Sequence, residues 1–361
     1  MNNYIEYNDR IAFHPGYYIK EIVDESGLTQ EDFAKRLDTT PKNLSILISG
    51  KQKLSIDIAM KLSRMLGTSI DYWLNLQKEY DVICAEFESE KLMAEERNLF
   101  ENLDYKYFKE NFKLPDLPRK IDEQIDAVRR FLDVSNLAVL KKNDLAVSFR
   151  GSASGLNELN TMKANIMVQI AVNKALKIDA PAFNNAKFED AIEYALTLTT
   201  EHKTFYPLIY NKFKNAGVIL IILPNLPGSK INGATKKMGK NIMLMVNDRR
   251  LYSDTFWFTL LHEIGHIINK DYGISFEKET GEQEQAADEY AANKLIPLKD
   301  YEYFLNQGIF NRDTIYQFAR QINRDPAIVL GRLQNDGIVP YDDRELNRLK
   351  HKYKVIINRD L

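Results

Sequence analysis

One stretch constrains the chain more than any other, residues 259–269, which read T-L-L-H-E-I-G-H-I-I-N. Two histidines stand four residues apart, a glutamate follows the first, and the rest of the stretch carries no charge. An α-helix is the conformation that places residues i and i+4 on one face. The stretch therefore predicts a helix from about Ser253 to Lys270, with His262 and His266 aimed at a common point.

The same spacing suits a metal ion. Both imidazoles can bind one ion, while Glu263, rotated by about 100° around the helix axis, can reach a water molecule on that ion without being a ligand. Metallopeptidases use the pattern H-E-x-x-H for this purpose. A catalytic zinc ion takes three protein ligands and keeps one open position. The ligand types favour zinc over manganese or iron, and a third ligand is required from elsewhere in the chain.

The acidic stretch E-Q-E-Q-A-A-D-E-Y-A-A-N-K-L is the best source of that ligand, in a helix expected from about Gly281 to Ile296. Glu284 and Asp288 share a helix face with two alanines, whose small size allows close packing against the histidine helix. Glu284 is the favoured third ligand and Glu282 its main competitor. Asp288 is expected to accept a hydrogen bond from a ligand histidine and so fix its tautomer.

Two apolar runs before the histidine helix predict β-strands. A-G-V-I-L-I-I-L-P reads as a buried strand and N-I-M-L-M-V-N-D as another, with the turn-rich stretch P-G-S-K-I-N-G-A-T-K-K-M-G-K between them. The second strand is expected to be a buried strand of a sheet, and it could also offer an edge to which an extended substrate adds as a further strand.

Residues 216–335 resemble the ImmA/IrrE family of gluzincin-like metallopeptidases. The resemblance is carried by GVILIILPNLPGSKINGAT, NIMLMVNDRRLYSDTFWFTLLHEIGH, EQAADEYAANKLIP and DPAIVLGRLQNDGIVPY. It implies an α+β zincin-like (gluzincin-type) fold with a small sheet, His262 and His266 as zinc ligands, Glu263 as general base and Glu284 as third ligand. Many family sequences carry a second acid where this chain has Ala286. Members usually cleave or control a DNA-binding repressor, which implies a protein substrate or partner regulator.

Residues 15–76 read as short helices. Thr29 and Thr40 are expected N-caps, and Pro41 occupies a favoured first helical position. The helices at 29–37 and 40–49, joined by a tight turn, predict a helix-turn-helix, whose second helix would lie in the major groove of DNA. The residues expected to contact DNA are Gln30, Thr39, Thr40, Lys42, Asn43 and Ser45.

The charge balance of this region decides whether DNA is a plausible partner. The whole chain has a net charge of −2, and residues 1–80 hold ten basic and eleven acidic side chains. Residues 33–64, however, hold seven basic side chains and only two acidic ones. Such a local excess is what phosphate contact requires. Within it, Asn43 can pair with adenine and Lys42 can reach guanine or phosphate.

Residues 14–77 resemble the HigA antitoxin branch of the Xre-type helix-turn-helix domains. The resemblance is carried by HPGYYIKEIVDESGLTQEDFAKRL and PKNLSILISGKQKLSIDIAMKLSRMLGTSIDYWLNLQ. It implies an all-α domain that binds a symmetric double-stranded DNA operator as a homodimer. The alternative is a helix-turn-helix fold used only for contact with proteins.

The expected domains are a helix-turn-helix domain at 1–78, a helical connector at 79–145, a metallopeptidase domain at 146–345 and a polar tail at 346–361. The stretch R-G-S-A-S-G at 150–155 reads as a loop. The single cysteine, Cys84, excludes an internal disulfide and a cysteine-based zinc site, and suits the reducing cytoplasm. No signal-peptide pattern opens the sequence, and the longest apolar run, Val218–Leu223, is too short to cross a membrane.

Together these features predict a DNA-binding regulator with zinc-dependent endopeptidase activity, one zinc ion per chain, and a partner regulatory protein as substrate. The two resemblances imply a role in toxin–antitoxin, phage or mobile-element control. The first alternative is a HigA-like antitoxin or repressor whose metal domain senses or binds a partner without cleaving it. The second is a peptidase whose N-terminal module only recognises a protein.

Overall fold

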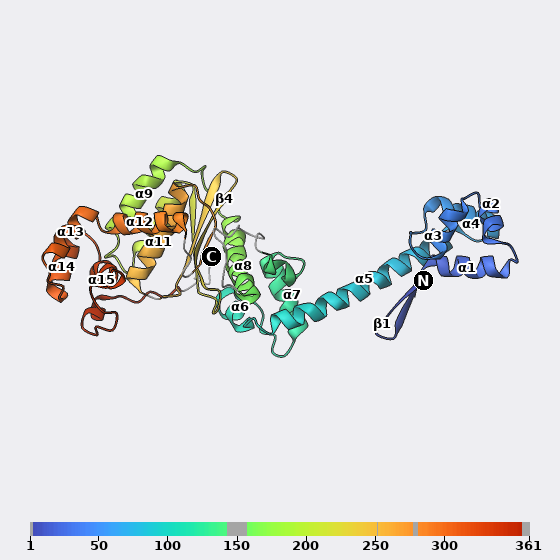
Figure 1. Ribbon diagram of the computed structural model, residues 1–361, viewed down its shortest axis with the longest axis horizontal. Helices are drawn as coiled ribbons and strands as arrows, with labels where there is room; N and C mark the ends of the chain where they lie inside the picture. Colours follow the sequence, from blue (N-terminus) through green and yellow to red (C-terminus); the bar gives the residue numbers. More distant parts are fainter. Residues whose placement is uncertain (1–2, 143–156, 251, 277–280, 356–361) are drawn as a thin grey trace. The chain divides into compact units, whose positions relative to one another are not determined.

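The computed structural model describes residues 3–142, 157–250, 252–276 and 281–355. It divides into two compact units, residues 1–97 and residues 98–361. The first is mainly helical, and the second combines helices with a four-stranded sheet (Figure 1). The predicted fold class, a helical helix-turn-helix region followed by an α+β domain with a small sheet, is confirmed.

The first unit begins with a hairpin that the sequence analysis missed. Its elements are β1 (Tyr4–Tyr7), β2 (Arg10–Phe13), α1 (Pro15–Glu25), α2 (Gln30–Arg36), α3 (Pro41–Ile48), α4 (Ile56–Leu66) and α5 (Ile70–Phe100). Asn8 and Asp9 connect the two strands with positive φ angles of 47° and 61°. Asparagine and aspartate tolerate this conformation and favour two-residue hairpin turns, so Asn8-Asp9 was the available signal.

Local hydrogen bonds define the helices of the first unit. The hydroxyl of Thr29 accepts from the backbone N–H of Asp32, and that of Thr40 from the backbone N–H of Asn43, both at 3.1 Å. Both predicted N-caps are therefore confirmed. Gly16 lets α1 approach the end of α3, because a Cβ there would lie 2.2 Å from a backbone oxygen of α3. The enclosed core holds Phe33, Leu44, Leu62, Trp73 and their apolar neighbours.

The helix α5 continues without a break through residue 78, where the first domain was expected to end. The predicted connector, residues 79–145, thus begins inside this helix. Beyond residue 97 it contributes α6 (Tyr105–Phe112), α7 (Ile121–Leu132) and the 3-10 helix η1 (Leu137–Lys141) to the second unit. Asn165 of the next helix donates its side-chain N–H to the backbone oxygen of Leu140 at 2.8 Å, which ties η1 into that unit.

The remaining elements of the second unit follow in chain order. They are α8 (Glu158–Ala175), α9 (Asn185–Thr197), α10 (Phe205–Asn215), β3 (Val218–Leu223), β4 (Ile231–Met238), β5 (Asn241–Asn247), α11 (Ser253–Ile268), β6 (Ile274–Phe276), α12 (Glu282–Leu295), α13 (Leu298–Asn306), α14 (Arg312–Gln321), α15 (Pro326–Asn335) and the 3-10 helix η2 (Leu346–Leu349).

The sheet corrects two expectations. Its strand order is β3-β5-β4-β6, with β3 parallel to β5, and with β4 antiparallel to both β5 and β6. The strand β4 occupies the stretch interpreted as turn-rich, so that interpretation was wrong. Its Gly and Lys residues weaken the strand pattern, but pairing on both sides overrides local propensity. Because β5 is also paired on both sides, it offers no edge to a substrate, and its interpretation as a buried strand is confirmed.

The sheet lies between helical layers. Figure 1 shows α8 on one face and α11 with α12 on the other. The strands β3 and β5 are almost entirely apolar and buried. On the face of α11 the core includes Trp257, Leu260, Leu261 and Ile264, each completely buried. This packing fixes the rotation of α11 about its axis, and with it the direction of the histidines.

The segment expected to be a polar tail from residue 346 packs against the second unit as far as it is described. Leu346 and Leu349 of η2 are buried. The ammonium nitrogen of Lys350 lies 2.7 Å from Asp254 Oδ2, and the backbone N–H of Ser253 donates to the backbone oxygen of His351. Residues 356–361 and the loop expected at 150–155 lie outside the described residues. None of the described helices is long and apolar enough to cross a membrane.

Candidate functional site

The candidate metal site is built by two helices that pack unusually close. Gly265 of α11 faces α12, where a Cβ on it would lie 3.2 Å from the Cα of Ala287 and from the ring of Tyr290. Ala287 and Ala291 are completely buried in this contact. The absence of bulk on both helices brings the acidic face of α12 over the histidines, as the alanine spacing had suggested.

Three side chains converge between the helices. His262 Nε2 and His266 Nε2 lie 3.0 Å apart. Glu284 Oε2 is 3.1 Å from His262 Nε2, and Glu284 Oε1 is 3.3 Å from His266 Nε2. All three residues are buried, with 8%, 0% and 7% of their surface exposed. Glu282, the competing candidate, is exposed at the start of α12 and lies outside this group.

The Nδ1 atom of each histidine, on the side of the ring away from Glu284, contacts a further carboxylate. His262 Nδ1 lies 2.7 Å from Asp288 Oδ1, the contact expected from the sequence. His266 Nδ1 lies 3.0 Å from Asp271 Oδ2, a residue that the sequence analysis missed. Asp271 follows Lys270, whose positive φ of 59° turns the chain back just after α11. The sequence feature that could have predicted this contact is an acid five residues after the second histidine, directly beyond the end of the helix.

The buried charges perturb the titration of the group. Burial opposes protonation of His262, yet its contacts with Asp288 and Glu284 and the charge of Glu263 raise its pKa to about 10. Burial likewise opposes ionisation of Glu284, but its contacts with His262 and His266 lower its pKa to about 2. The group therefore favours a positive charge between the carboxylates.

The donor set fits a divalent metal ion. When both imidazoles are neutral and each donates its Nδ1 proton to its carboxylate, both Nε2 atoms carry lone pairs, and these two nitrogens lie 3.0 Å apart. A cation between them removes the repulsion that two such lone pairs suffer. One ligand atom from each of His262, His266 and Glu284 lies within 4.8 Å of the others. Two imidazoles and a carboxylate suit zinc, with each imidazole oriented by an outer carboxylate.

Glu263 is completely buried next to this group, although it is not one of the convergent ligands. Its side chain lies against Gly233 of β4. A Cβ on Gly233 would be 2.5 Å from Glu263 Cγ and 2.5 Å from Glu263 Oε1. The sequence analysis missed Gly233 because it lies in the stretch that was interpreted as a turn. Glycine in a strand interior often marks such a close approach.

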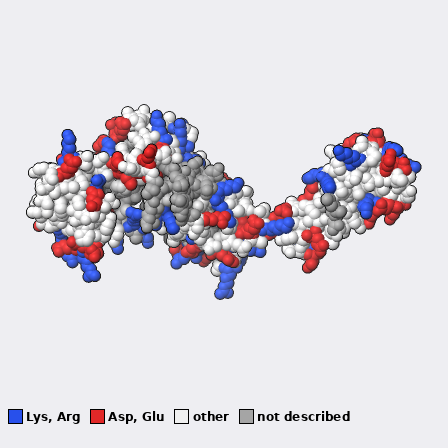
Figure 2. Space-filling view, viewed as in Figure 1, with Lys and Arg blue, Asp and Glu red and all other residues white. Residues whose placement is uncertain are grey.

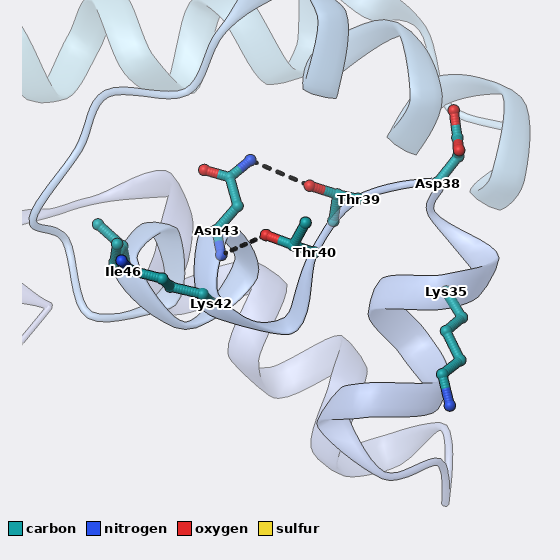
Figure 3. Close-up of a pocket in the computed structure, with 7 residues that line it drawn as sticks. All are labelled: Lys35, Asp38, Thr39, Thr40, Lys42, Asn43 and Ile46. Carbon is teal, nitrogen blue, oxygen red and sulfur yellow. Dashed lines mark hydrogen bonds between the residues drawn. The ribbon is translucent and has the colours of Figure 1, made fainter.

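Four of the residues expected to contact DNA, Thr39, Thr40, Lys42 and Asn43, line one pocket at the start of α3 (Figure 3). Gln30, Thr40, Lys42 and Ser45 are exposed, whereas Asn43 is half-buried. Asn43 Nδ2 donates to the hydroxyl of Thr39 at 3.0 Å, and Gln52 Nε2 donates to Asn43 Oδ1 at 2.7 Å. These two contacts fix the orientation of the Asn43 amide.

Ion pairs reduce the local excess of positive charge. Lys35 pairs with Glu31, Lys53 with Asp81, and Lys61 with both Asp38 and Asp57. Four exposed basic side chains between residues 33 and 64 form no ion pair with a described residue, namely Arg36, Lys42, Lys51 and Arg64. Figure 2 shows acidic and basic side chains mixed on the visible face.

Two family models match the chain. The Helix-turn-helix model matches residues 19–73, and the IrrE N-terminal-like domain model of peptidase family M78 matches residues 219–319. The second match includes both histidines, Glu263 and Glu284. The expected fusion of these two modules is confirmed.

Individual relatives each match only a small part of the chain. An uncharacterised HTH-type transcriptional regulator of Escherichia coli K12, YddM, is 38% identical over 79 residues, which are 21% of this chain and 84% of that protein. Virulence-associated protein A' of Dichelobacter nodosus is 41% identical over 70 residues, 19% of this chain and 61% of that protein. A Pseudomonas aeruginosa protein solved with its operator DNA is 26% identical, covering 22% of this chain and 89% of that one, with a TM-score of 0.22.

The first of these relatives is matched over most of its own length, and the helix-turn-helix model covers the core of the first unit. The chain therefore belongs to the helix-turn-helix family of transcriptional regulators, and it joins that module to an IrrE N-terminal-like domain.

Proposed function

We propose that the IrrE N-terminal-like domain is a zinc-dependent endopeptidase that cleaves a partner regulatory protein, and that the helix-turn-helix domain binds a DNA operator as a homodimer. The observation that carries the proposal is the convergence of His262, His266 and Glu284, with Glu263 buried alongside. In this proposal Glu284 is the third ligand, and Asp271 and Asp288 orient the two histidines.

The chain's own residues divide the chemistry between them. His262, His266 and Glu284 hold the ion, which when bound polarises both a water molecule and the carbonyl of the scissile peptide. Glu263 takes a proton from the attacking water and passes it to the leaving amine. Burial of Glu263 against the backbone at Gly233 restricts the positions that its carboxylate can take. Glu263 is therefore expected to be essential for cleavage but not for metal binding.

Metal content is the first test. Purified wild-type protein is compared with His262→Ala and Glu284→Ala by elemental mass spectrometry. We expect about one zinc ion per wild-type chain, and a loss of the ion in both variants. Glu282→Ala, which alters the exposed neighbour on the same helix, is the matched control and should retain the ion. A folded wild-type protein without bound metal would rule out the peptidase.

Glu263→Gln separates cleavage from sensing. The substitution keeps the shape of the side chain but removes the base. The variant should bind zinc normally, lose cleavage of the partner, and lose the regulatory effect in cells. An unchanged regulatory effect in cells would instead favour a repressor or antitoxin whose metal domain only binds or senses a partner.

DNA binding is tested by operator footprinting. A specific footprint that weakens as salt is raised is expected, because phosphate contacts release counterions. Asn43→Ala should relax base preference, whereas Lys42→Ala should weaken binding to all sequences and reduce the salt dependence. Lys53→Ala, at a lysine already paired with Asp81, is the control. The absence of any footprint would favour a module that recognises only proteins.

A further inference from the structure

A second site lies in the second unit, and none of the three convergent ligands lines it. It is a cavity of about 1260 Å³ bounded by α8, α10, α11, the strand β3 and residues 352–355. Pockets for small organic ligands usually measure about 300–1,000 Å³. The cavity is thus large enough for a small molecule of substantial size.

The walls of the cavity are strongly biased toward positive charge. Among the described lining residues are eight lysine or arginine side chains and only two acids, Glu110 and Asp248. Glu110 already pairs with Lys106. Asp248 accepts hydrogen bonds from the backbone N–H groups of Asn225 and Val355. Both acids are therefore engaged by other groups, and the basic side chains outnumber them eight to two among the described lining residues.

Lys174 is the lining lysine whose surroundings oppose its positive charge most clearly. It is half-buried, and burial together with the charge of Lys177 lowers its pKa, with no acid acting in the opposite direction. Its ammonium group lies 5.9 Å from the centre of the Phe112 ring. Five lining lysines form no ion pair with a described residue, namely Lys174, Lys177, Lys203, Lys352 and Lys354. Such a group attracts an anion into a site with partly apolar walls.

The rest of the lining is apolar and aromatic. Ile221 and Ile222 of β3 form one part of the wall, and Tyr206, Tyr210 and Phe256 contribute rings. Rings of this kind offer large apolar surfaces to a flat or chain-like ligand body. A lining of lysines and aromatic rings favours a ligand with one anionic group and one apolar part.

We propose that this cavity binds an amphipathic organic anion, a carboxylate or phosphate attached to an aromatic or acyl body. The apolar body would lie against β3 and the rings, and the anionic group would pair with Lys174, Lys177 and the lysines of residues 352–354. The enclosing helices on several sides favour a small molecule over a protein segment. The site also touches α11 at Thr259, three residues before His262 and on the same helix face. A bound ligand would thus contact the helix that carries the metal ligands.

The test uses the full-length protein and the fluorescent probe anilinonaphthalene sulfonate, which has an aromatic body and one negative charge. Wild type should bind one probe molecule saturably. Lys177→Glu and Lys354→Glu should each weaken binding about tenfold or more, and Tyr206→Ala should weaken it less. Lys299→Glu makes the same charge change at an exposed lysine outside the cavity and should leave binding unchanged. Near-ultraviolet circular dichroism confirms that each variant is folded.

Competition then identifies the source of the ligand. Displacement of the probe by dodecanoate indicates an acyl carboxylate, and displacement by ATP indicates a nucleotide. Either result supports the site. Non-saturable binding, or an equal loss in Lys299→Glu, would overturn it, as would displacement only by an acidic polypeptide such as polyglutamate. Probe binding should survive in His262→Ala, so the result does not depend on the proposed peptidase activity.

Discussion

Glu263 and Gly233 occupy one small volume beside the candidate metal site. The carboxylate of Glu263 lies where any side chain on residue 233 would have to be, with 2.5 Å between its Oε1 and an added Cβ. The candidate site therefore depends on the lack of a side chain at residue 233 as much as on the carboxylate of Glu263. Two predictions concern single side chains of this kind.

Gly233→Ala should displace the Glu263 carboxylate without removing a metal ligand. Because the φ angle of Gly233 is not in the left-handed region, alanine suits its backbone, and the clash falls on the buried glutamate. We expect bound zinc to stay near one per chain while cleavage of the partner falls as far as in Glu263→Gln. Gly281→Ala, where an added Cβ meets no atom within 4 Å, is the control. Cleavage at the wild-type rate in Gly233→Ala would refute this arrangement.

Asp271→Asn should weaken metal binding more than Asp288→Asn does. Both carboxylates contact Nδ1 of a histidine, but the side chain of Asp271 is 12% exposed and that of Asp288 is 58% exposed. A buried, charge-assisted hydrogen bond contributes more than an exposed one. Outer carboxylates of this type typically change metal affinity about 10- to 100-fold. Competition with a zinc chelator measures both affinities, and equal losses would show that burial is not decisive.

Close helix contact is the feature that assembles the candidate site at the scale of elements. The helices α11 and α12 meet at Gly265 and Ala287, and this contact sets the distance between Glu284 and the histidines.

A polar network joins three other segments of the second unit. There the imidazole of His202 contacts both Asp325, which caps α15, and the hydroxyl of Tyr353.

Gly265→Val should separate α11 from α12. A single Cβ would already lie 3.2 Å from the Cα of Ala287, and the two further methyl groups of valine have no room. Overpacking of this kind typically costs about 1–3 kcal/mol. We expect a lower melting temperature and a loss of zinc even though all three ligands are present. Gly265→Ala should show a much smaller effect, and full zinc content in the valine variant would contradict the role of this contact.

Asp325 should make the second unit more sensitive to rising pH. Burial raises its pKa from 3.8 to about 6, so the folded state favours the protonated form. The associated stabilisation is present below about pH 4 and is lost as the pH rises through 6, by up to about 3 kcal/mol. Asp325→Asn should remove this dependence, so the variant gains stability relative to wild type between pH 4 and pH 7. Thermal melts at several pH values measure the difference, and parallel curves would refute it.

The whole molecule consists of two units, each with its own hydrophobic core. All of the candidate metal ligands belong to the second unit, and the helix-turn-helix belongs to the first. Metal binding should therefore stabilise only one of the two units.

Calorimetry tests this separation. A metal held at about 100 times its dissociation constant adds about 2.7 kcal/mol to the stability of the unit that binds it. We expect two unfolding transitions, of which a chelator lowers only the one that belongs to residues 98–361. His262→Ala should lack the response to chelator. A chelator that lowers both transitions equally would show that the units unfold together.

The local part of the structure was readable from the sequence. Thr29, Thr40 and Pro41 predicted the start of their helices, because N-caps and first-turn prolines act within a few residues. The spacing of His262 and His266 predicted a shared helix face for the same reason. The hairpin at residues 4–13 and the strand β4 were missed, since four-residue strands and a strand rich in glycine and lysine carry little local signal.

The sequence by itself determined the helix-turn-helix, the HExxH helix, and the candidates Glu284 and Asp288 on the following acidic helix. Only the tertiary structure decided that Glu284 rather than Glu282 lies with the histidines, that Asp271 is placed behind His266, and that Gly233 accommodates Glu263. The physical reason is the separation along the chain over which each kind of interaction acts. Helix periodicity and capping depend on neighbours a few residues away, whereas these contacts depend on how close α11 lies to α12 and to β4, which the packing of the whole core sets.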